Sequence, residues 1–208
     1  MKLKICGMKY NIKEVAALQP DYLGFIFWKP SKRFFEGTIP PLPAQTKKIG
    51  VFVDAPIKEV FEKANTYSLY GVQLHGKESP EYCKKLKPTE FAIIKVFSMV
   101  NDFDFSVLRE YEDVCDYFLF DTQGKLPGGN GYIFDWSVLK NYCSTKPYFL
   151  SGGIGPEEVE QLRSFFKSPE SGYCHAIDIN SRFELRPGLK NTDTLKEFKK
   201  LLRYELSR

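Results

Sequence analysis

Short apolar runs alternate with amphipathic stretches along the whole chain. The apolar runs are nearly continuous, which is typical of strands in a parallel sheet that is covered on both faces. Eight such runs predict strands over Leu3–Cys6, Tyr22–Phe27, Lys48–Val53, Gly71–Leu74, Ala92–Val96, Tyr117–Phe120, Tyr148–Ser151 and Cys174–Ile179.

Most stretches between these strands predict helices, because their apolar residues recur at the spacing of one helical face. The expected helices are Asn11–Leu18, with Asn11 as its cap, and Ile57–Ala64, Pro80–Leu86, Phe105–Tyr111, Trp136–Tyr142, Pro156–Phe166 and Thr192–Leu206. One stretch departs from this alternation of strands and helices, since the three prolines of Gly37–Gln45 allow at most about one turn of helix. We therefore expect the second crossover to be short or irregular.

Eight strands that alternate with seven or eight helices over 208 residues predict an α/β fold. The best match is a single-domain (β/α)₈ TIM barrel that covers residues 1–208. An open doubly wound sheet is the alternative. The chain has no G-x-G-x-x-G turn between a strand and a helix, so nothing favours a dinucleotide-binding version of it.

Composition narrows the choice of partners. The chain has 30 basic and 26 acidic residues and no dense basic cluster of the kind that binds nucleic acid. No apolar run reaches the ~18–20 residues needed to cross a bilayer, and no signal-peptide pattern is present at the start. The five cysteines are scattered without a C-x-x-C pair, which argues against a zinc site or a disulfide framework. We expect a cytoplasmic protein with neither nucleic-acid nor membrane partners.

A thiol and a carboxylate stand where a barrel of this kind has its active site, at the C-terminal ends of the strands. Cys6 ends the first predicted strand and Asp121 follows the sixth. Facing one cavity, they can transfer protons to and from a substrate held between them. Each also has a plain structural interpretation, as a buried cysteine or as a carboxylate that caps a loop. Their joint occurrence favours catalysis.

The segment Ser151-Gly152-Gly153-Ile154-Gly155-Pro156 leads from the seventh predicted strand into a helix. Glycines leave backbone N–H groups accessible, and a helix N-terminus attracts anions. Barrels often bind phosphate after strands seven and eight, so this position favours a phosphate site. The alternative is a tight turn that needs glycine for its geometry alone.

Three further features of the rim are candidates for substrate binding. Arg33, in the basic turn after the second strand, is suited to hold a carboxylate with two parallel hydrogen bonds, although a surface turn has the same composition. His75 ends the fourth strand and is equally consistent with a structural residue. The loop Gly128-Gly129-Asn130-Gly131 is either a lid or a flexible connection. No cluster of His, Cys and carboxylates has the spacing of a metal site.

Taken in order, these segments resemble the phosphoribosylanthranilate isomerase family of tryptophan biosynthesis. The matching pieces are Lys4-Ile5-Cys6-Gly7, Gly24-Phe25-Ile26-Phe27, Ser31-Lys32-Arg33, Gly50-Val51-Phe52-Val53, Val72-Gln73-Leu74-His75-Gly76, Phe120-Asp121-Thr122, Gly128-Gly129-Asn130-Gly131, Phe134-Asp135-Trp136, Leu150-Ser151-Gly152-Gly153-Ile154 and Pro187-Gly188-Leu189-Lys190. Each piece is weak alone, but all of them in this order are highly specific.

The resemblance implies an Amadori rearrangement of N-(5-phosphoribosyl)anthranilate to 1-(2-carboxyphenylamino)-1-deoxyribulose 5-phosphate, without a metal or organic cofactor. It implies that Cys6 is the general base and Asp121 the general acid, which asks for a Cys6 pKa below ~8.5 and an Asp121 pKa above ~3.9. The small phosphoribosyl substrate is expected to contact Arg33, Gln73, His75 and Gly129, and its phosphate to contact Gly152, Gly153, Asn180 and Ser181. A monomer or homodimer is expected.

The chain departs from the family pattern at Asn180-Ser181-Arg182, where relatives usually carry Ser-Ser-Gly. Arg182 would supply charge to the phosphate in place of that glycine. Two alternatives to the isomerase are weighed. The related histidine-pathway aminoaldose isomerase has a carboxylate at the end of strand one, where this chain has Cys6. A non-catalytic phosphosugar-binding barrel would keep the glycine loops but have no use for the acid–base pair.

Overall fold

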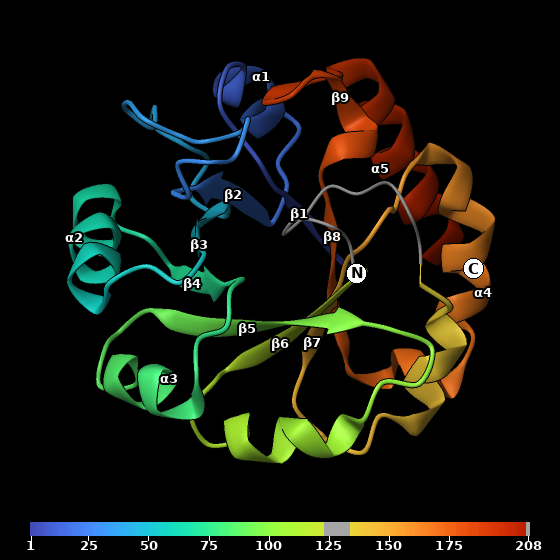
Figure 1. Ribbon diagram of the computed structural model, residues 1–208. Helices are drawn as coiled ribbons and strands as arrows, with labels where there is room; N and C mark the ends of the chain where they lie inside the picture. Colours follow the sequence, from blue (N-terminus) through green and yellow to red (C-terminus); the bar gives the residue numbers. More distant parts are fainter. Residues whose placement is uncertain (123–133, 207–208) are drawn as a thin grey trace.

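A computed structural model describes residues 1–122 and 134–206 of the chain (Figure 1). Its eight parallel strands close into a barrel in chain order, because β1 (Lys2–Ile5) pairs with both β2 (Tyr22–Ile26) and β8 (Cys174–Ile179). The other strands are β3 (Lys47–Phe52), β4 (Gly71–Leu74), β5 (Ala92–Met99), β6 (Tyr117–Thr122) and β7 (Tyr148–Leu150). The predicted (β/α)₈ barrel is confirmed, and the open sheet is excluded.

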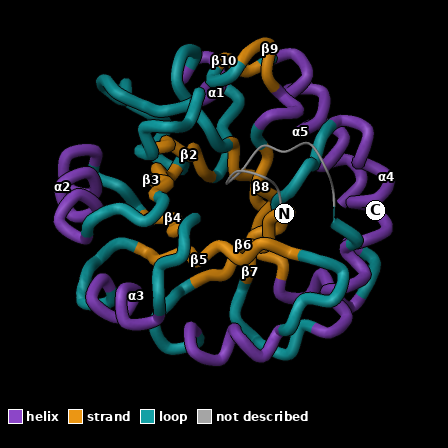
Figure 2. Tube along the Cα trace, in the orientation of Figure 1, coloured by secondary structure: helices purple, strands orange, loops and turns teal. Residues whose placement is uncertain are grey.

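Helices surround the strands on the outside, as Figure 2 shows. The α-helices are α1 (Ile12–Ala17), α2 (Ile57–Tyr67), α3 (Pro80–Leu86), α4 (Val159–Phe166) and α5 (Thr192–Leu206). Short 3₁₀ helices occupy Pro156–Glu158, Pro169–Tyr173 and Ser181–Phe183. In the part of the chain that the structure describes, no helix combines the length and the apolar character needed to pass through a bilayer.

Two of the predicted helices, those after β5 and β6, are 3₁₀ helices over Phe105–Tyr111 and Trp136–Asn141. Each follows an aspartate whose carboxylate accepts a hydrogen bond from the backbone two residues later. Asp104 accepts from Ser106 N at 2.9 Å, and Asp135 accepts from Ser137 N at 2.9 Å. The apolar spacing therefore identified the helical segments but not their tighter winding.

The crossover between β2 and β3 contains no helix, as its prolines predict. Phe35 N donates a hydrogen bond to Ile26 O at 2.7 Å, which holds the segment against the end of β2. The Phe35 ring packs edge-on against Phe25 and Tyr67, with centroids 5.0 and 5.8 Å away. Aromatic side chains of an irregular segment thus cover the part of the barrel that a helix covers elsewhere.

The strands separate two apolar clusters. The larger cluster lies between the strands and the surrounding helices and includes Phe25 of β2 and Val60 of α2. The smaller cluster fills the barrel, since its buried members all come from strands: Tyr22, Ile49, Ile94, Val96, Leu119, Phe149 and Ala176. Toward the C-terminal ends of the strands the barrel contains buried polar side chains instead, among them Gln73 and Asp178.

A two-stranded hairpin, β9 (Glu184–Arg186) and β10 (Leu189–Lys190), follows β8 and was not predicted. Its turn contains Gly188 at a φ of 83°, a conformation that favours glycine. The side chain of Asn11 fastens the hairpin to the start of α1, donating to Lys190 O at 2.8 Å and accepting from Lys190 N at 3.0 Å. Asn11 is the N-cap residue of α1, as predicted, but its side chain makes no hydrogen bond to its own helix.

Candidate active site

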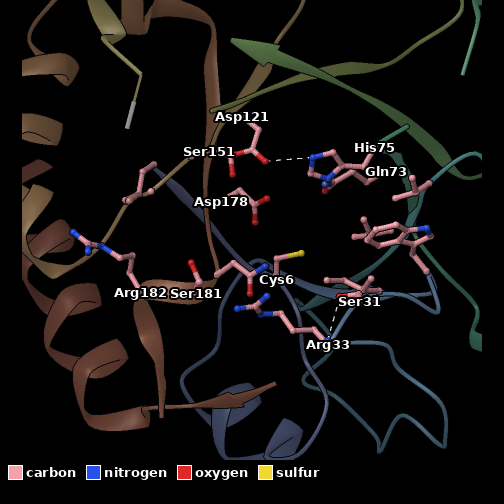
Figure 3. Close-up of a pocket in the computed structure, with 18 residues that line it drawn as sticks. Cys6, Ser31, Arg33, Gln73, His75, Asp121, Ser151, Asp178, Ser181 and Arg182 are labelled. Carbon is pink, nitrogen blue, oxygen red and sulfur yellow. Dashed lines mark hydrogen bonds and ion pairs between the residues drawn. The ribbon is translucent and has the colours of Figure 1, made fainter. Parts of the chain in front are cut away.

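A pocket opens at the C-terminal ends of the strands (Figure 3). It is lined by every predicted site residue that lies within the described part of the chain: Cys6, Arg33, Gln73, His75, Asp121, Gly152, Gly153, Asn180 and Ser181. Gly129 and the rest of its glycine-rich loop lie outside the described residues. Segments far apart in the sequence thus meet at one rim, as the barrel topology predicts.

Cys6 follows β1 directly, and its backbone N–H donates to Ile179 O of β8 at 2.8 Å. The residue is only 4% exposed. Gly24 of β2 makes room for the thiol, because a Cβ on that glycine would lie 2.8 Å from Cys6 Sγ. Burial raises the pKa of Cys6, and the nearby ammonium groups of Lys4 and Lys190 offset only part of this effect. The expected lowering of the Cys6 pKa is therefore wrong.

Lys4, two residues before Cys6, points into the barrel and was not predicted as part of the site. Its Nζ lies 2.8 Å from Asp178 Oδ2 of β8 and 2.7 Å from Gln73 Oε1 of β4. Burial alone would lower the pKa of Lys4, but the negative charges of Asp178 and Cys6 outweigh it and raise the pKa. Lys4 is therefore a buried cation directly beneath the thiol.

Asp121 lies near the end of β6 and faces His75. Its Oδ2 is 3.3 Å from His75 Nε2, and its Oδ1 accepts from Thr122 N at 3.0 Å. On its other side, His75 Nδ1 lies 3.3 Å from Gln73 Nε2. Figure 3 shows Asp121 and His75 on one side of the pocket, Cys6 on the other, and Asp178 between them.

Arg33 is directed into the pocket by a turn in which its backbone N–H donates to Ser31 Oγ at 3.1 Å. Its guanidinium already binds a protein carboxylate. Nε lies 3.0 Å from both oxygens of Glu184, and Nη2 lies 2.7 Å from Oε2. Burial alone would raise the pKa of Glu184, but Arg33 and Lys190 outweigh it and lower the pKa. Sequence reasoning missed this partner, because nothing in the chain indicated that Glu184 lies near the second strand.

The turn after β7 needs its glycines for geometry and also lies at the pocket. Gly152 and Gly153 have φ values of 91° and 72°, and both line the pocket. A Cβ on Gly152 would lie 2.2 Å from Thr122 Oγ1. The turn thus requires glycine, and its backbone borders the pocket.

Arg182, in the 3₁₀ helix Ser181–Phe183, lies beside Gly155, where the turn leads into the 3₁₀ helix Pro156–Glu158. Its Nη2 is 3.6 Å from Glu157 Oε2 and 3.5 Å from Glu158 Oε1, and Gly155 N donates to Glu158 Oε2 at 2.7 Å. The arginine therefore neutralises acidic side chains next to the glycine turn.

Throughout the residues that the structure describes, no three His, Cys, Asp or Glu side chains are grouped so as to hold a metal ion.

Comparison with known proteins supplies what geometry alone does not. The family model described as N-(5'phosphoribosyl)anthranilate (PRA) isomerase matches residues 3–200. The chain belongs to this PRA isomerase family. The isomerase of Parabacteroides distasonis is 47% identical over 208 residues, covering 95% of this chain and 91% of the relative. The isomerase of Phocaeicola vulgatus is 40% identical over 200 residues, covering 95% and 96%.

Solved PRA isomerases have the same fold. The Thermotoga maritima isomerase superposes with a TM-score of 0.81 at 30% identity, covering 98% of this chain and 99% of that one. A PRA isomerase bound to reduced 1-(o-carboxyphenylamino)-1-deoxyribulose 5-phosphate gives a TM-score of 0.78 at 28% identity, with the same coverage. Another Thermotoga maritima structure is of monomers generated from a dimeric isomerase.

Family membership confirms the predicted enzyme class. The chain is a PRA isomerase, an enzyme of tryptophan biosynthesis. The histidine-pathway isomerase and the non-catalytic sugar-binding barrel are therefore set aside.

Proposed function

We propose that the rim pocket performs the PRA isomerase reaction by general acid–base catalysis, with Asp121 as the acid and Cys6 as the base. The reaction converts N-(5-phosphoribosyl)anthranilate to 1-(2-carboxyphenylamino)-1-deoxyribulose 5-phosphate. One observation carries the proposal. The thiol of Cys6 and the carboxyl group of Asp121 line the same pocket, from β1 and from β6.

In the first step, the carboxyl group of Asp121 gives its proton to the ring oxygen of the ribose. The bond between that oxygen and C1 breaks, and the lone pair of the anthranilate nitrogen forms a C1=N⁺ double bond. His75, 3.3 Å from Asp121 Oδ2, holds the carboxyl group in place for this transfer.

In the second step, the Cys6 thiolate removes the proton from C2. The electrons of the C2–H bond form a C1=C2 double bond, and those of C1=N⁺ return to nitrogen. The resulting enolamine becomes the ketone when its C2 hydroxyl loses a proton and C1 gains one, so the reaction is a net isomerisation. Lys4 and Lys190 supply the positive charge that favours the thiolate against its burial.

The remaining residues of the pocket hold the two ends of the substrate. We assign the anthranilate carboxylate to Arg33, with Gln73 and His75 lining the centre of the pocket. We assign the phosphate to the backbone of Gly152 and Gly153 and to the two residues after β8, Asn180 and Ser181. All four line the pocket. The site lies within one barrel domain, in a monomer or a homodimer working in the cytoplasm.

The test is a fluorescence assay that follows the consumption of freshly generated N-(5-phosphoribosyl)anthranilate. Cys6→Ala and Asp121→Asn should each lower kcat by roughly a hundredfold or more, the scale of lost acid–base help. Cys143→Ala is the control, since Cys143 is exposed and outside the pocket. Near-normal turnover in either site variant would contradict its assigned role. Arg33→Ala should mainly raise KM.

A further inference from the structure

Glu184 is a carboxylate that binds Arg33, one of the residues that line the pocket. It lies at the start of β9, and its side chain is 4% exposed. Oε1 accepts from Arg33 Nε at 3.0 Å, from Gly188 N at 3.0 Å and from Lys190 Nζ at 2.9 Å. Oε2 accepts from Arg33 Nη2 at 2.7 Å. A buried carboxylate with two cationic partners and a backbone donor has a fixed geometry.

Lys190 extends this network to the segment that follows β8. Its Nζ also donates to the backbone oxygen of Asn180 at 3.1 Å and to Asn180 Oδ1 at 2.8 Å. Asn180 belongs to the segment after β8 to which we assign the phosphate. One chain of hydrogen bonds therefore runs from Arg33, through Glu184 and Lys190, to Asn180.

We propose that Glu184 is a positioning residue that orients Arg33 for the anthranilate carboxylate. The inference rests on the proposed role of Arg33. Glu184 binds Nε and one N–H of Nη2, so the end of the guanidinium formed by Nη1 and the second N–H of Nη2 is left for the substrate. The substrate carboxylate can then accept two parallel hydrogen bonds from this free end of a prepositioned guanidinium. Fixing the arginine in advance lowers the entropy cost of binding.

A double-mutant cycle tests this role, with the dissociation constant of the reduced product analogue as the readout. Glu184→Gln should weaken binding about tenfold, the loss of one charge-assisted contact. In an Arg33→Ala background the same change should have less than about a twofold effect, because Glu184 acts through Arg33. Glu62→Gln, on the exposed face of α2, is the control and should change nothing.

A second readout separates orientation from general stability. An analogue of the reduced product that lacks the carboxylate should bind wild type and Glu184→Gln equally well. Equal weakening of both ligands, or an undiminished effect in the Arg33→Ala background, would overturn the proposal. If Glu184→Gln does not fold, Glu184→Asp enters the same cycle, since it keeps the charge and shortens the reach. Because the readout is binding, it is independent of whether Cys6 and Asp121 are the catalytic pair.

A different observation concerns Asp178. Its Oδ2 binds Lys4, but its Oδ1 is buried and meets no hydrogen-bond donor from the described residues. The carboxylate lines the pocket and lies between Asp121 and Cys6 in Figure 3. Leaving a buried acceptor without a partner is unfavourable, and a ligand that donates a hydrogen bond to it removes this penalty. The open-chain substrate carries such a donor on C2, next to the reacting C1.

We infer that Asp178 Oδ1 accepts the hydrogen bond of the substrate's C2 hydroxyl and takes its proton as the ketone forms. The C2–O bond becomes C2=O, the C1=C2 electrons form a C–H bond at C1, and the Cys6 thiol returns the proton it took from C2. The proton on Asp178 then replaces the one that Asp121 gave to the ring oxygen. Burial raises the pKa of Asp178, which favours its uptake of a proton. This step rests on the proposed roles of Cys6 and Asp121.

The competing explanation is that Asp178 only holds Lys4. Asp178→Asn should lower kcat roughly a hundredfold, while the reduced product analogue binds within about threefold of wild type. In a Lys4→Met background, Asp178→Asn should still lower kcat at least about tenfold. If it adds nothing there, Asp178 acts only through Lys4 and the inference fails. Lys4→Gln replaces Lys4→Met in the cycle if the apolar variant does not fold. Normal turnover of Cys6→Ala would instead contradict the proposed acid–base mechanism itself.

Discussion

Lys4 Nζ lies 2.8 Å from Asp178 Oδ2, inside the barrel and beneath Cys6. One buried cation therefore stabilises both a carboxylate and the thiolate form of a cysteine. Leaving either acid uncompensated would be costly, because a buried charge without a partner is strongly destabilising. The pair links the first and last strands of the barrel at the place where the reaction is proposed to occur.

The pH dependence of the reaction follows from the environment of Cys6. Because burial raises its pKa, the thiolate fraction should still be rising above the ordinary cysteine value of about 8.5. We expect kcat/KM to increase with pH through this range and the rise to move to higher pH in Lys4→Gln, which removes a nearby positive charge. The measurement is kcat/KM against pH for both proteins. A plateau already reached at neutral pH in wild type would contradict the assignment.

Arg182 should strengthen phosphate binding. Arg182→Gly restores the glycine usual at this position in the family and removes a cation that offsets Glu157 and Glu158. We expect KM to rise about tenfold with little change in kcat, since a charge-assisted hydrogen bond contributes about 1.5–3 kcal/mol. Inorganic phosphate should inhibit the variant more weakly by a similar factor. Arg109→Ala, at an exposed position of the 3₁₀ helix Phe105–Tyr111 and outside the pocket, is the control. An unchanged inhibition constant for phosphate would exclude the contact.

Gly152 should not tolerate a side chain. At its φ of 91°, alanine is strained, and its Cβ would lie 2.2 Å from Thr122 Oγ1. We expect Gly152→Ala to lose about 1–3 kcal/mol of unfolding free energy in urea titrations and to weaken phosphate binding. Gly172→Ala is the matched control, because a Cβ there meets nothing within 4 Å and its φ is not in the left-handed region. Equal stability of the two variants would refute this account.

His175 should make the barrel sensitive to acid at the end away from the pocket. Burial, with Lys2 and Lys47 nearby, lowers its pKa to about 4, although Asp21 opposes the shift. The unfolded chain takes up this proton near pH ~6.5, so stability present above that pH is lost as pH falls toward 4. We expect the loss to be about 1–2 kcal/mol after allowing for solvent screening.

His175→Gln should remove this part of the pH dependence, because glutamine does not titrate. Its amide can keep a hydrogen bond to the Tyr22 hydroxyl, which lies 2.8 Å from His175 Nε2. Urea titrations at pH 7, 5 and 4 measure the effect. Parallel losses of stability in variant and wild type would show that other groups are responsible.

The fold could be predicted because its signals are local. Each strand is a short apolar run, and the prolines of Gly37–Gln45 correctly indicated a crossover without a helix. The β9–β10 hairpin was missed because its strands have only three and two residues. The Pro187-Gly188 pair between them was the available signal, since such pairs mark turns.

The site was predictable to the extent that strand order fixes it. Cys6 and Asp121 reach one pocket because both lie at the C-terminal ends of barrel strands. Glu184 and Lys190 could not be placed in this way, because they come from the hairpin and meet Arg33 only through the tertiary fold. Lys4 did leave a signal, as a single charge within the apolar run Leu3–Cys6 on the same strand face as Cys6.

The pairing of β1 with β8 places partners far apart along the polypeptide, since Lys4 and Asp178 are 174 positions apart. Contacts of such separation form late and slowly, because a very large loop must first be closed. During synthesis, most of the chain must therefore be made before β1 can pair with β8. Recovery of turnover during refolding then reports the final closing event, not the earlier appearance of secondary structure.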